Sequence, residues 1–209
     1  MIALFTTIQY MKIITLSGVD GSGKSTQLLQ LQKLLETEGA KVTYIHAVAF
    51  SLPQTVREFF TRPGKEKTLR KANVKSNFLG VLLRKAILLI DLLRFHFFVK
   101  RLKKEGVQYL LSDRYFYDTL VNIAYLDGTR LSTTFARLAS RFIPKPDRAF
   151  YLQVTPEKIM ARPRKPEQGL QYLKDKTLLF NEAAVAWSFI TLNADEPIDA
   201  VFESIKQSV

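Results

Sequence analysis

The sequence contains no cysteine, two histidines and one tryptophan among its 209 residues. Without cysteine the chain can form no disulfide, no thiolate zinc site and no cysteine nucleophile, and it suits a reducing compartment, so we expect a cytoplasmic protein. His46 and His96 lie far apart in the sequence, with no carboxylate at metal-ligand spacing. We therefore expect no histidine-based metal site.

Positive charge is abundant and unevenly distributed. Residues 57–105 contain 14 lysines and arginines against 4 acidic residues, a surplus of 10 in a chain whose formal net charge is +12. Such a surplus attracts nucleotides, nucleic acid or an anionic membrane surface, although a solvated basic face without a partner gives the same composition. Because no nucleic-acid-binding motif accompanies the charge, we do not expect a nucleic-acid partner.

Short apolar runs alternate with helical patterns from residue 12 onward. This alternation is typical of an α/β fold, in which a parallel sheet is covered by helices on both faces. The expected strands cover residues 12–17, 41–46, 107–112, 148–154 and 188–192. We expect a single domain over residues 12–209 and an N-terminal extension over residues 1–11 that lacks the pattern of a signal peptide.

Residues 77–104 form the most apolar segment of the chain. Arg84, Asp91 and Arg94 interrupt it too often for a membrane span, so we expect a long buried helix. At about 100° per residue these three side chains share one narrow sector of that helix. Charged groups on such a stripe need partners or a ligand.

Residues 18–26 match the phosphate-loop pattern GxxxxGK[ST] between an apolar strand and an amphipathic helix. The glycines let the backbone curl so that its N–H groups point at phosphate oxygens, whereas the alternative is a tight corner without a ligand. Lys24 can reach the β- and γ-phosphates of ATP, and the Ser25 hydroxyl can ligate Mg²⁺. The expected ATP-binding residues are Gly18, Val19, Asp20, Gly21, Ser22, Gly23, Lys24, Ser25 and Thr26.

Asp113, Arg114 and Tyr115 follow the third expected strand. The carboxyl end of a strand is where ligands bind in open α/β sheets. Asp113 can hold Mg²⁺ through water or accept a proton from the phosphate acceptor, and Arg114 can bind an acceptor phosphate with two parallel hydrogen bonds. The alternative is a local ion pair with no part in catalysis.

A basic, proline-broken segment over residues 161–168 follows the fourth expected strand and a short helix. We interpret it as a mobile lid, with Arg162 and Arg164 as candidates for the cation that phosphoryl transfer requires. A basic surface loop without a catalytic role is the alternative.

Taken in order, these segments resemble the thymidylate kinase family of nucleoside monophosphate kinases over residues 12–208. The resemblance rests on GVDGSGKST, on SDRY after a strand, on PDRAFYLQVTPEKIMAR before an arginine-rich lid, and on a C-terminal strand and helix. It implies a three-layer α/β/α P-loop NTPase fold with a five-stranded sheet in the order 2-3-1-4-5. It also implies ATP and Mg²⁺ as cofactors, dTMP as the expected acceptor, and a homodimer packed through helices.

The same resemblance implies catalytic and acceptor residues. In the family a catalytic arginine comes from the phosphate loop or from the lid, and the loop here has none, so Arg162 or Arg164 is expected to supply it. The expected catalytic residues are Lys24, Asp113, Arg114, Arg162 and Arg164, and the expected metal ligands are Ser25 and Asp113. The expected acceptor-binding residues are Arg84, Asp91, Arg94, Tyr115, Asp118 and Asn122.

The acceptor half departs from the family pattern. Asp91 aligns with the aspartate of a family Asp-Arg pair, but Leu92 follows it, so Arg84 or Arg94 would have to replace the arginine. The family pattern DRYxxS ends here in Asp118, which either hydrogen-bonds an acceptor hydroxyl or caps the following helix. Because of these departures, a kinase acting on a nucleoside or another small molecule and a nucleic-acid-associated P-loop ATPase remain alternatives.

Overall fold

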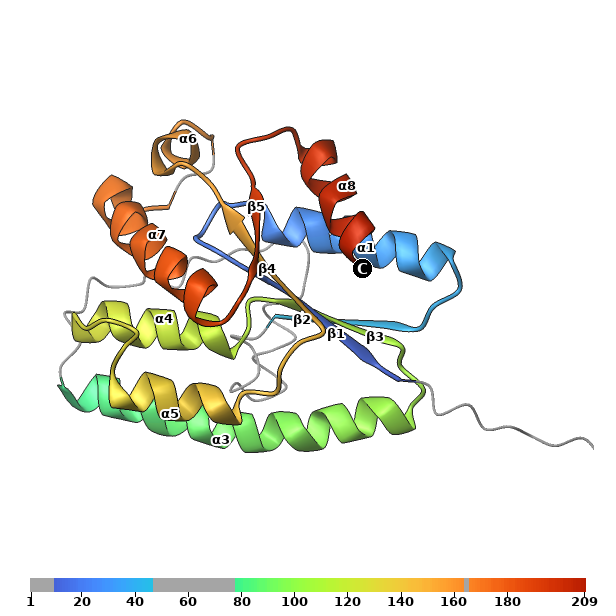
Figure 1. Cartoon of the computed structure of the whole chain (residues 1–209), viewed down its shortest axis with the longest axis horizontal. Helices are drawn as coiled ribbons and strands as arrows, with labels where there is room; N and C mark the ends of the chain where they lie inside the picture. Colours follow the sequence, from blue (N-terminus) through green and yellow to red (C-terminus); the bar gives the residue numbers. More distant parts are fainter. Residues whose placement is uncertain (1–9, 47–77, 164–165) are drawn as a thin grey trace, which may run out of the picture.

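The computed structural model describes residues 10–46, 78–163 and 166–209, and its centre is a five-stranded sheet (Figure 1). All strand pairs are parallel and the order is β2-β3-β1-β4-β5. The strands are β1 Lys12–Ser17, β2 Val42–His46, β3 Tyr109–Asp113, β4 Arg148–Gln153 and β5 Ile190–Asn193. This order confirms the predicted P-loop NTPase fold.

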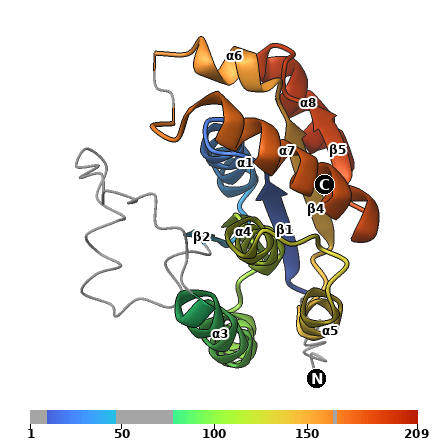
Figure 2. The same ribbon diagram turned by 90° about the vertical axis from the view of Figure 1, so that its left-hand side faces the viewer.

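Helices lie on both sides of the sheet (Figure 2). They are α1 Lys24–Thr37, α3 Phe78–Lys104, α4 Phe116–Asp127, α5 Thr134–Phe142, α6 Pro156–Met160, α7 Gly169–Ala186 and α8 Ile198–Ser208. Helix α1 packs against α8 on one side, while α4 packs between α3 and α7 on the other. The arrangement is the predicted three-layer α/β/α architecture.

Two strands begin two residues later than the sequence predicts, because the residues expected at their start close the preceding helix. The Val107 N–H donates a hydrogen bond of 3.1 Å to the Leu102 carbonyl of α3. Ser188 has a left-handed backbone (φ 53°), and the Phe189 N–H donates to the Ala184 carbonyl at the end of α7. An N–H used in this way cannot join the sheet, so β3 starts at residue 109 and β5 at residue 190.

Helix α3 is buried along one side only, which corrects the prediction of a long buried helix. Its core-facing side chains are Val81, Leu88, Leu92, Phe95 and Leu102. The opposite side exposes Leu79, Leu82, Leu83, Leu89, Ile90, Leu93 and Phe97. Composition alone could not separate these two sides, because both are apolar. Within the described ranges, no helix combines the length and the apolar character that crossing a bilayer requires.

The strand register brings the predicted motifs to one edge of the sheet. Leu16 of β1 pairs with Asp113 of β3, and His46 of β2 pairs with the same residue. The phosphate loop leaves β1 one residue after Ser17, so it starts beside Asp113. At the other end of β1, Met11 is only 2% exposed, so core packing begins one residue inside the expected N-terminal extension.

Candidate active site

The loop between β1 and α1 has a backbone that its glycines make possible. Gly18, Gly21 and Gly23 have φ values of 143°, 84° and 100°, a region that residues with a side chain rarely adopt. A Cβ atom on Gly18 would also lie 2.8 Å from the Leu152 carbonyl oxygen. The loop therefore curls tightly against β4 and turns directly into the N-terminus of α1, where an anion is stabilised.

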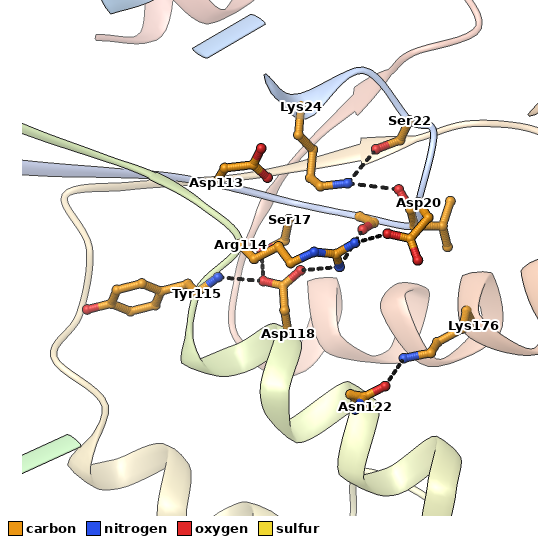
Figure 3. Close-up of polar contacts among 12 residues, drawn as sticks. Ser17, Asp20, Ser22, Lys24, Asp113, Arg114, Tyr115, Asp118, Asn122 and Lys176 are labelled. Atoms are coloured by element: carbon orange, nitrogen blue, oxygen red, sulfur yellow. Dashed lines mark hydrogen bonds and ion pairs between the residues drawn. The ribbon is translucent and has the colours of Figure 1, made fainter. Parts of the chain in front are cut away.

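Lys24 extends from the start of α1 back into this loop (Figure 3). Its side chain is buried, and its ammonium donates hydrogen bonds to the Val19 carbonyl at 2.8 Å and to Ser22 Oγ at 3.3 Å. Burial and the nearby charge of Arg114 lower the pKa of Lys24 to about 8. A phosphate group beside the ammonium would offset this cost, because an opposite charge favours the protonated form.

Asp113 lies at the end of β3 with its carboxylate against the start of α1. The Ser25 hydroxyl donates to Asp113 Oδ2, and the Tyr44 hydroxyl donates to the same oxygen at 3.1 Å. The second oxygen, Oδ1, is buried and has no hydrogen-bond partner among the described residues. An unsatisfied carboxylate oxygen beside a serine hydroxyl fits a magnesium ion that keeps water and phosphate among its ligands.

Arg114 joins the phosphate loop to helix α4. Its guanidinium pairs with Asp20 of the loop, lies 3.8 Å from Asp118 of α4, and reaches the Gly18 carbonyl at 3.5 Å. Burial alone would lower the pKa of Arg114, but Asp20, Asp118 and Asp113 outweigh burial and raise it. Arg114 is therefore a fixed, permanently charged group, as a phosphate-binding arginine needs to be.

The Arg114 backbone is itself unusual, with a left-handed φ of 68°. Its N–H donates to the Leu16 carbonyl at 3.0 Å, and its carbonyl accepts from the Ser112 hydroxyl at 2.6 Å. These two bonds hold the residue in a conformation that costs energy outside glycine. The strain is confined to the turn that aims the guanidinium at the phosphate loop.

Asp118 caps helix α4. Its Oδ2 accepts from the Tyr115 N–H at 2.9 Å and from the Ser17 hydroxyl at 2.6 Å, while burial raises the pKa of the carboxyl group against the opposing charge of Arg114. Of the two alternatives drawn from the sequence, the structure shows the cap. Asp118 also provides Arg114 with a second carboxylate neighbour, so it lies next to the site as well.

The polar groups of Tyr115 and Asn122 are hydrogen-bonded within the protein. The Tyr115 side chain is fully buried, donates its hydroxyl to the Pro144 carbonyl at 2.9 Å, and packs edge-on against Phe95. Asn122 Oδ1 accepts a hydrogen bond of 2.9 Å from Lys176 of α7. The structure therefore assigns Tyr115 to the core and Asn122 to a helix–helix contact.

The three charged side chains of the stripe on α3 differ in burial. Asp91 is buried, whereas Arg84 and Arg94 are exposed, and Arg94 lies 4.0 Å from Asp91. Between described residues, no hydrogen bond or ion pair links these side chains to the cluster around Arg114. The expected replacement of the family's base-contacting arginine by Arg84 or Arg94 therefore stays a prediction.

The lid segment contacts the phosphate loop through Arg162, whose guanidinium donates to the Gly21 carbonyl. Arg164 lies outside the described residues. Arg162 also borders a cavity of about 330 Å³ next to the loop. The cavity is lined by Ser22, Gly23, Thr26, Gln27, Leu152, Arg162, Ala194, Glu196, Ile198 and Val201. A cavity of this size beside the phosphate loop has room for the base of a nucleoside triphosphate.

Sequence reasoning missed Tyr44, Tyr172 and Lys176. Tyr44 is two positions before His46 on the same face of β2, which strand alternation could have shown. Tyr172 and Lys176 are four residues apart on α7, the spacing at which two side chains share a helix face. Nothing in the sequence indicated what that face would contact.

Comparison with known proteins identifies the family of this chain. Residues 16–205 match the family model for thymidylate kinase. A thymidylate kinase from Thermosipho africanus is 30% identical over 94% of this chain and 96% of its own length. A probable thymidylate kinase from Sulfurisphaera tokodaii is 27% identical over 95% of this chain and 95% of its own length. Another from Archaeoglobus fulgidus is 24% identical over 94% of this chain and 94% of its own length. The chain belongs to the thymidylate kinase family.

Proposed function

We propose that this protein uses ATP to phosphorylate dTMP to dTDP. The observation that carries the proposal is the convergence of the Lys24 ammonium, the Asp113 carboxylate and the Arg114 guanidinium at one edge of the sheet, in a chain of the thymidylate kinase family. The relatives compared above bear the name thymidylate kinase. The family relationship does not favour a nucleic-acid-associated ATPase.

The proposed reaction joins two phosphates held at adjacent positions. An oxygen of the dTMP phosphate attacks the γ-phosphorus of ATP, a new O–P bond forms, and the bond to the β,γ-bridging oxygen breaks as ADP leaves. Lys24 and Arg162 stabilise the charge on the transferring group, and Arg114 binds the acceptor phosphate and orients its oxygen. Mg²⁺ held by Ser25 and Asp113 would neutralise charge on the donor phosphates.

The direct test is an acceptor panel. ADP release from Mg-ATP is measured with dTMP, dUMP, UMP, CMP, AMP, GMP and thymidine, with the Lys24→Ala protein as the blank. Preference for dTMP supports the proposal. Turnover of thymidine without turnover of dTMP would instead identify a nucleoside kinase. No ADP release with any of these compounds would contradict a nucleoside or nucleoside monophosphate as the acceptor.

Asp113→Asn is expected to weaken the use of Mg²⁺. The change removes the negative charge that a divalent cation requires but keeps the shape of the side chain. We expect the Mg²⁺ concentration for half-maximal turnover to rise at least about tenfold. Calorimetry of ATP binding with and without Mg²⁺ provides a second readout that does not depend on turnover.

Asp127→Asn is the matched control for that measurement, since Asp127 ends α4 and pairs with Lys85 at 3.1 Å instead of facing the phosphate loop. Its Mg²⁺ dependence should equal that of the wild type. An unchanged Mg²⁺ requirement in the Asp113→Asn protein would remove Asp113 from the proposed metal site.

We also propose a homodimer that packs through α3. The resemblance to the family implies helix packing between two copies, and the exposed side of α3 presents a continuous apolar face. Apolar faces of this extent usually mark protein contacts, because burying them in an interface is favourable. A second copy of the same helix is an equally apolar partner.

Ile90→Glu is expected to separate the dimer, because Ile90 is 55% exposed near the middle of that face and a carboxylate there would be desolvated in the interface. The dissociation constant should rise by about thirtyfold or more, measured by sedimentation of the 23.9 kDa chain. Leu178→Glu on α7 is the control, because Leu178 is 64% exposed outside α3. A wild-type monomer at all concentrations would contradict the proposal.

A further inference from the structure

Lys176 is a buried cation that the proposed reaction does not use. It lies in the second turn of α7 and is only 5% exposed. Withdrawing an ammonium group from water is costly unless other groups take over its hydration, so a lysine in this position needs specific partners. Those partners indicate its role.

Two helices supply contacts to Lys176. Its Nζ atom donates to Asn122 Oδ1 at 2.9 Å and lies 5.2 Å from the centre of the Tyr125 ring and 5.8 Å from that of Tyr172. The two rings meet edge to face at 5.3 Å. Asn122 and Tyr125 belong to α4, whereas Tyr172 belongs to α7. Lys176 therefore joins α7 to α4 through the hydrogen bond to Asn122 (Figure 3) and the cation–π contact with Tyr125, while its contact with Tyr172 lies within α7.

Tyr172 connects this junction to the phosphate loop. Its hydroxyl donates to Asp20 Oδ2 at 3.3 Å, while Asp20 Oδ1 pairs with the Arg114 guanidinium. The contacts form one continuous path from Lys176 through Tyr172 and Asp20 to Arg114. At the far end of the path is the group that we assign to the acceptor phosphate.

The two helices joined by Lys176 each follow a segment that we assign to the site. Helix α4 starts immediately after Tyr115, and α7 starts immediately after the lid segment. A change in the spacing of these helices would move Tyr172, and with it the carboxylate that orients Arg114. The sheet itself does not depend on this contact, because the strands pair through their own backbones.

We propose that Lys176 is a positioning residue for phosphate-acceptor binding, acting through Tyr172 and Asp20 on Arg114. The inference rests on the proposed function, since its readout is phosphorylation of the acceptor. It assigns to α7 a part in acceptor binding that neither the phosphate loop nor the Asp-Arg-Tyr segment reveals.

The test compares Lys176→Met with Lys174→Met. Methionine keeps most of the length of the side chain but removes the charge, and Lys174 is an exposed neighbour on α7 that pairs with Glu157 of α6. We expect Lys176→Met to raise the KM for dTMP about tenfold while the KM for ATP stays within about twofold of wild type. Lys174→Met should leave both values unchanged, and Lys176→Arg should recover most of the dTMP affinity.

Tyr172→Phe tests the same path without altering the buried charge. It should raise the KM for dTMP. In the double variant with Lys176→Met, the rise in this KM should be smaller than the product of the two single-variant rises, because both changes break the same path. If Lys176→Met fails to fold, Tyr172→Phe still tests whether the path to Arg114 affects dTMP binding.

Three results would overturn the positioning role of Lys176. They are equal rises in the KM values for dTMP and ATP, a lower melting temperature with an unchanged KM for dTMP, and independent effects of Lys176→Met and Tyr172→Phe in the double variant. A wild-type protein that phosphorylates no member of the acceptor panel would contradict the proposed function. An active wild type with an unaffected Lys176→Met protein would contradict this inference alone.

Discussion

Lys24→Ala is expected to lower kcat by about a thousandfold and to leave the protein folded. Lys24 is the only lysine in the phosphate loop, and its ammonium already lies in the curl of that loop, 2.8 Å from the Val19 carbonyl. Its role is to stabilise charge that develops on the β- and γ-phosphates during transfer. Arg114 is not free to replace it, because Asp20 and Asp118 hold the guanidinium.

The fold should tolerate this change because burying the Lys24 ammonium costs free energy in the folded protein. Burial lowers the pKa of Lys24, which means that the folded protein disfavours the charge compared with water. Circular dichroism and melting temperature check the fold, and ADP release checks turnover. Lys33→Ala on the exposed side of α1 is the control. A folded Lys24→Ala protein with full activity would refute the proposed mechanism.

Arg162→Ala is expected to have an effect of similar size, with kcat about a thousandfold below wild type. The phosphate loop contains no arginine, so in the proposed mechanism an arginine of the lid stabilises the transferring group. Arg162 contacts the Gly21 carbonyl and borders the cavity beside the loop, so its guanidinium lies close to where donor phosphates would bind. Single-turnover measurement with saturating ATP separates this loss from weaker donor binding.

Arg164→Ala is the matched variant for that experiment, since it removes the other arginine of the lid segment. If Arg162 is catalytic, Arg164→Ala should retain most of the activity, and Arg162→Lys should recover part of it by restoring a positive charge. The reverse result, with Arg164→Ala inactive and Arg162→Ala active, would transfer the catalytic role to Arg164.

The parts of the site that sequence predicted are those whose chemistry is encoded locally. The glycines around Lys24 are required by the backbone of the loop, and the Asp113–Arg114 pair comes at the end of a strand. In a parallel sheet the carboxyl ends of neighbouring strands lie at one edge, so two motifs far apart in the sequence could be expected to meet. The hydrogen bond between Ser25 and Asp113 shows that they do.

The parts that sequence could not predict depend on which side of an element faces which neighbour. Tyr115 follows directly after the site residues but turns into the core, where Phe95 meets it edge to face. Helix α3 is apolar on both sides, so periodicity did not show that only one side is buried. Asn122 aligned with an acceptor-binding position of the family, yet its partner Lys176 lies on a helix 54 residues further along the chain.

By itself, the sequence determined the phosphate loop, the strand ends that carry Asp113 and Arg114, and the order of elements that makes the sheet parallel. These follow from local backbone requirements and from alternating apolar patterns, which are written residue by residue. Only the tertiary structure decided that Asp118 is a helix cap, that Tyr115 belongs to the core, and that Lys176 joins α4 to α7. The physical reason is that a side chain's role depends on its burial and its partners, and helix packing sets both between residues that are distant in sequence.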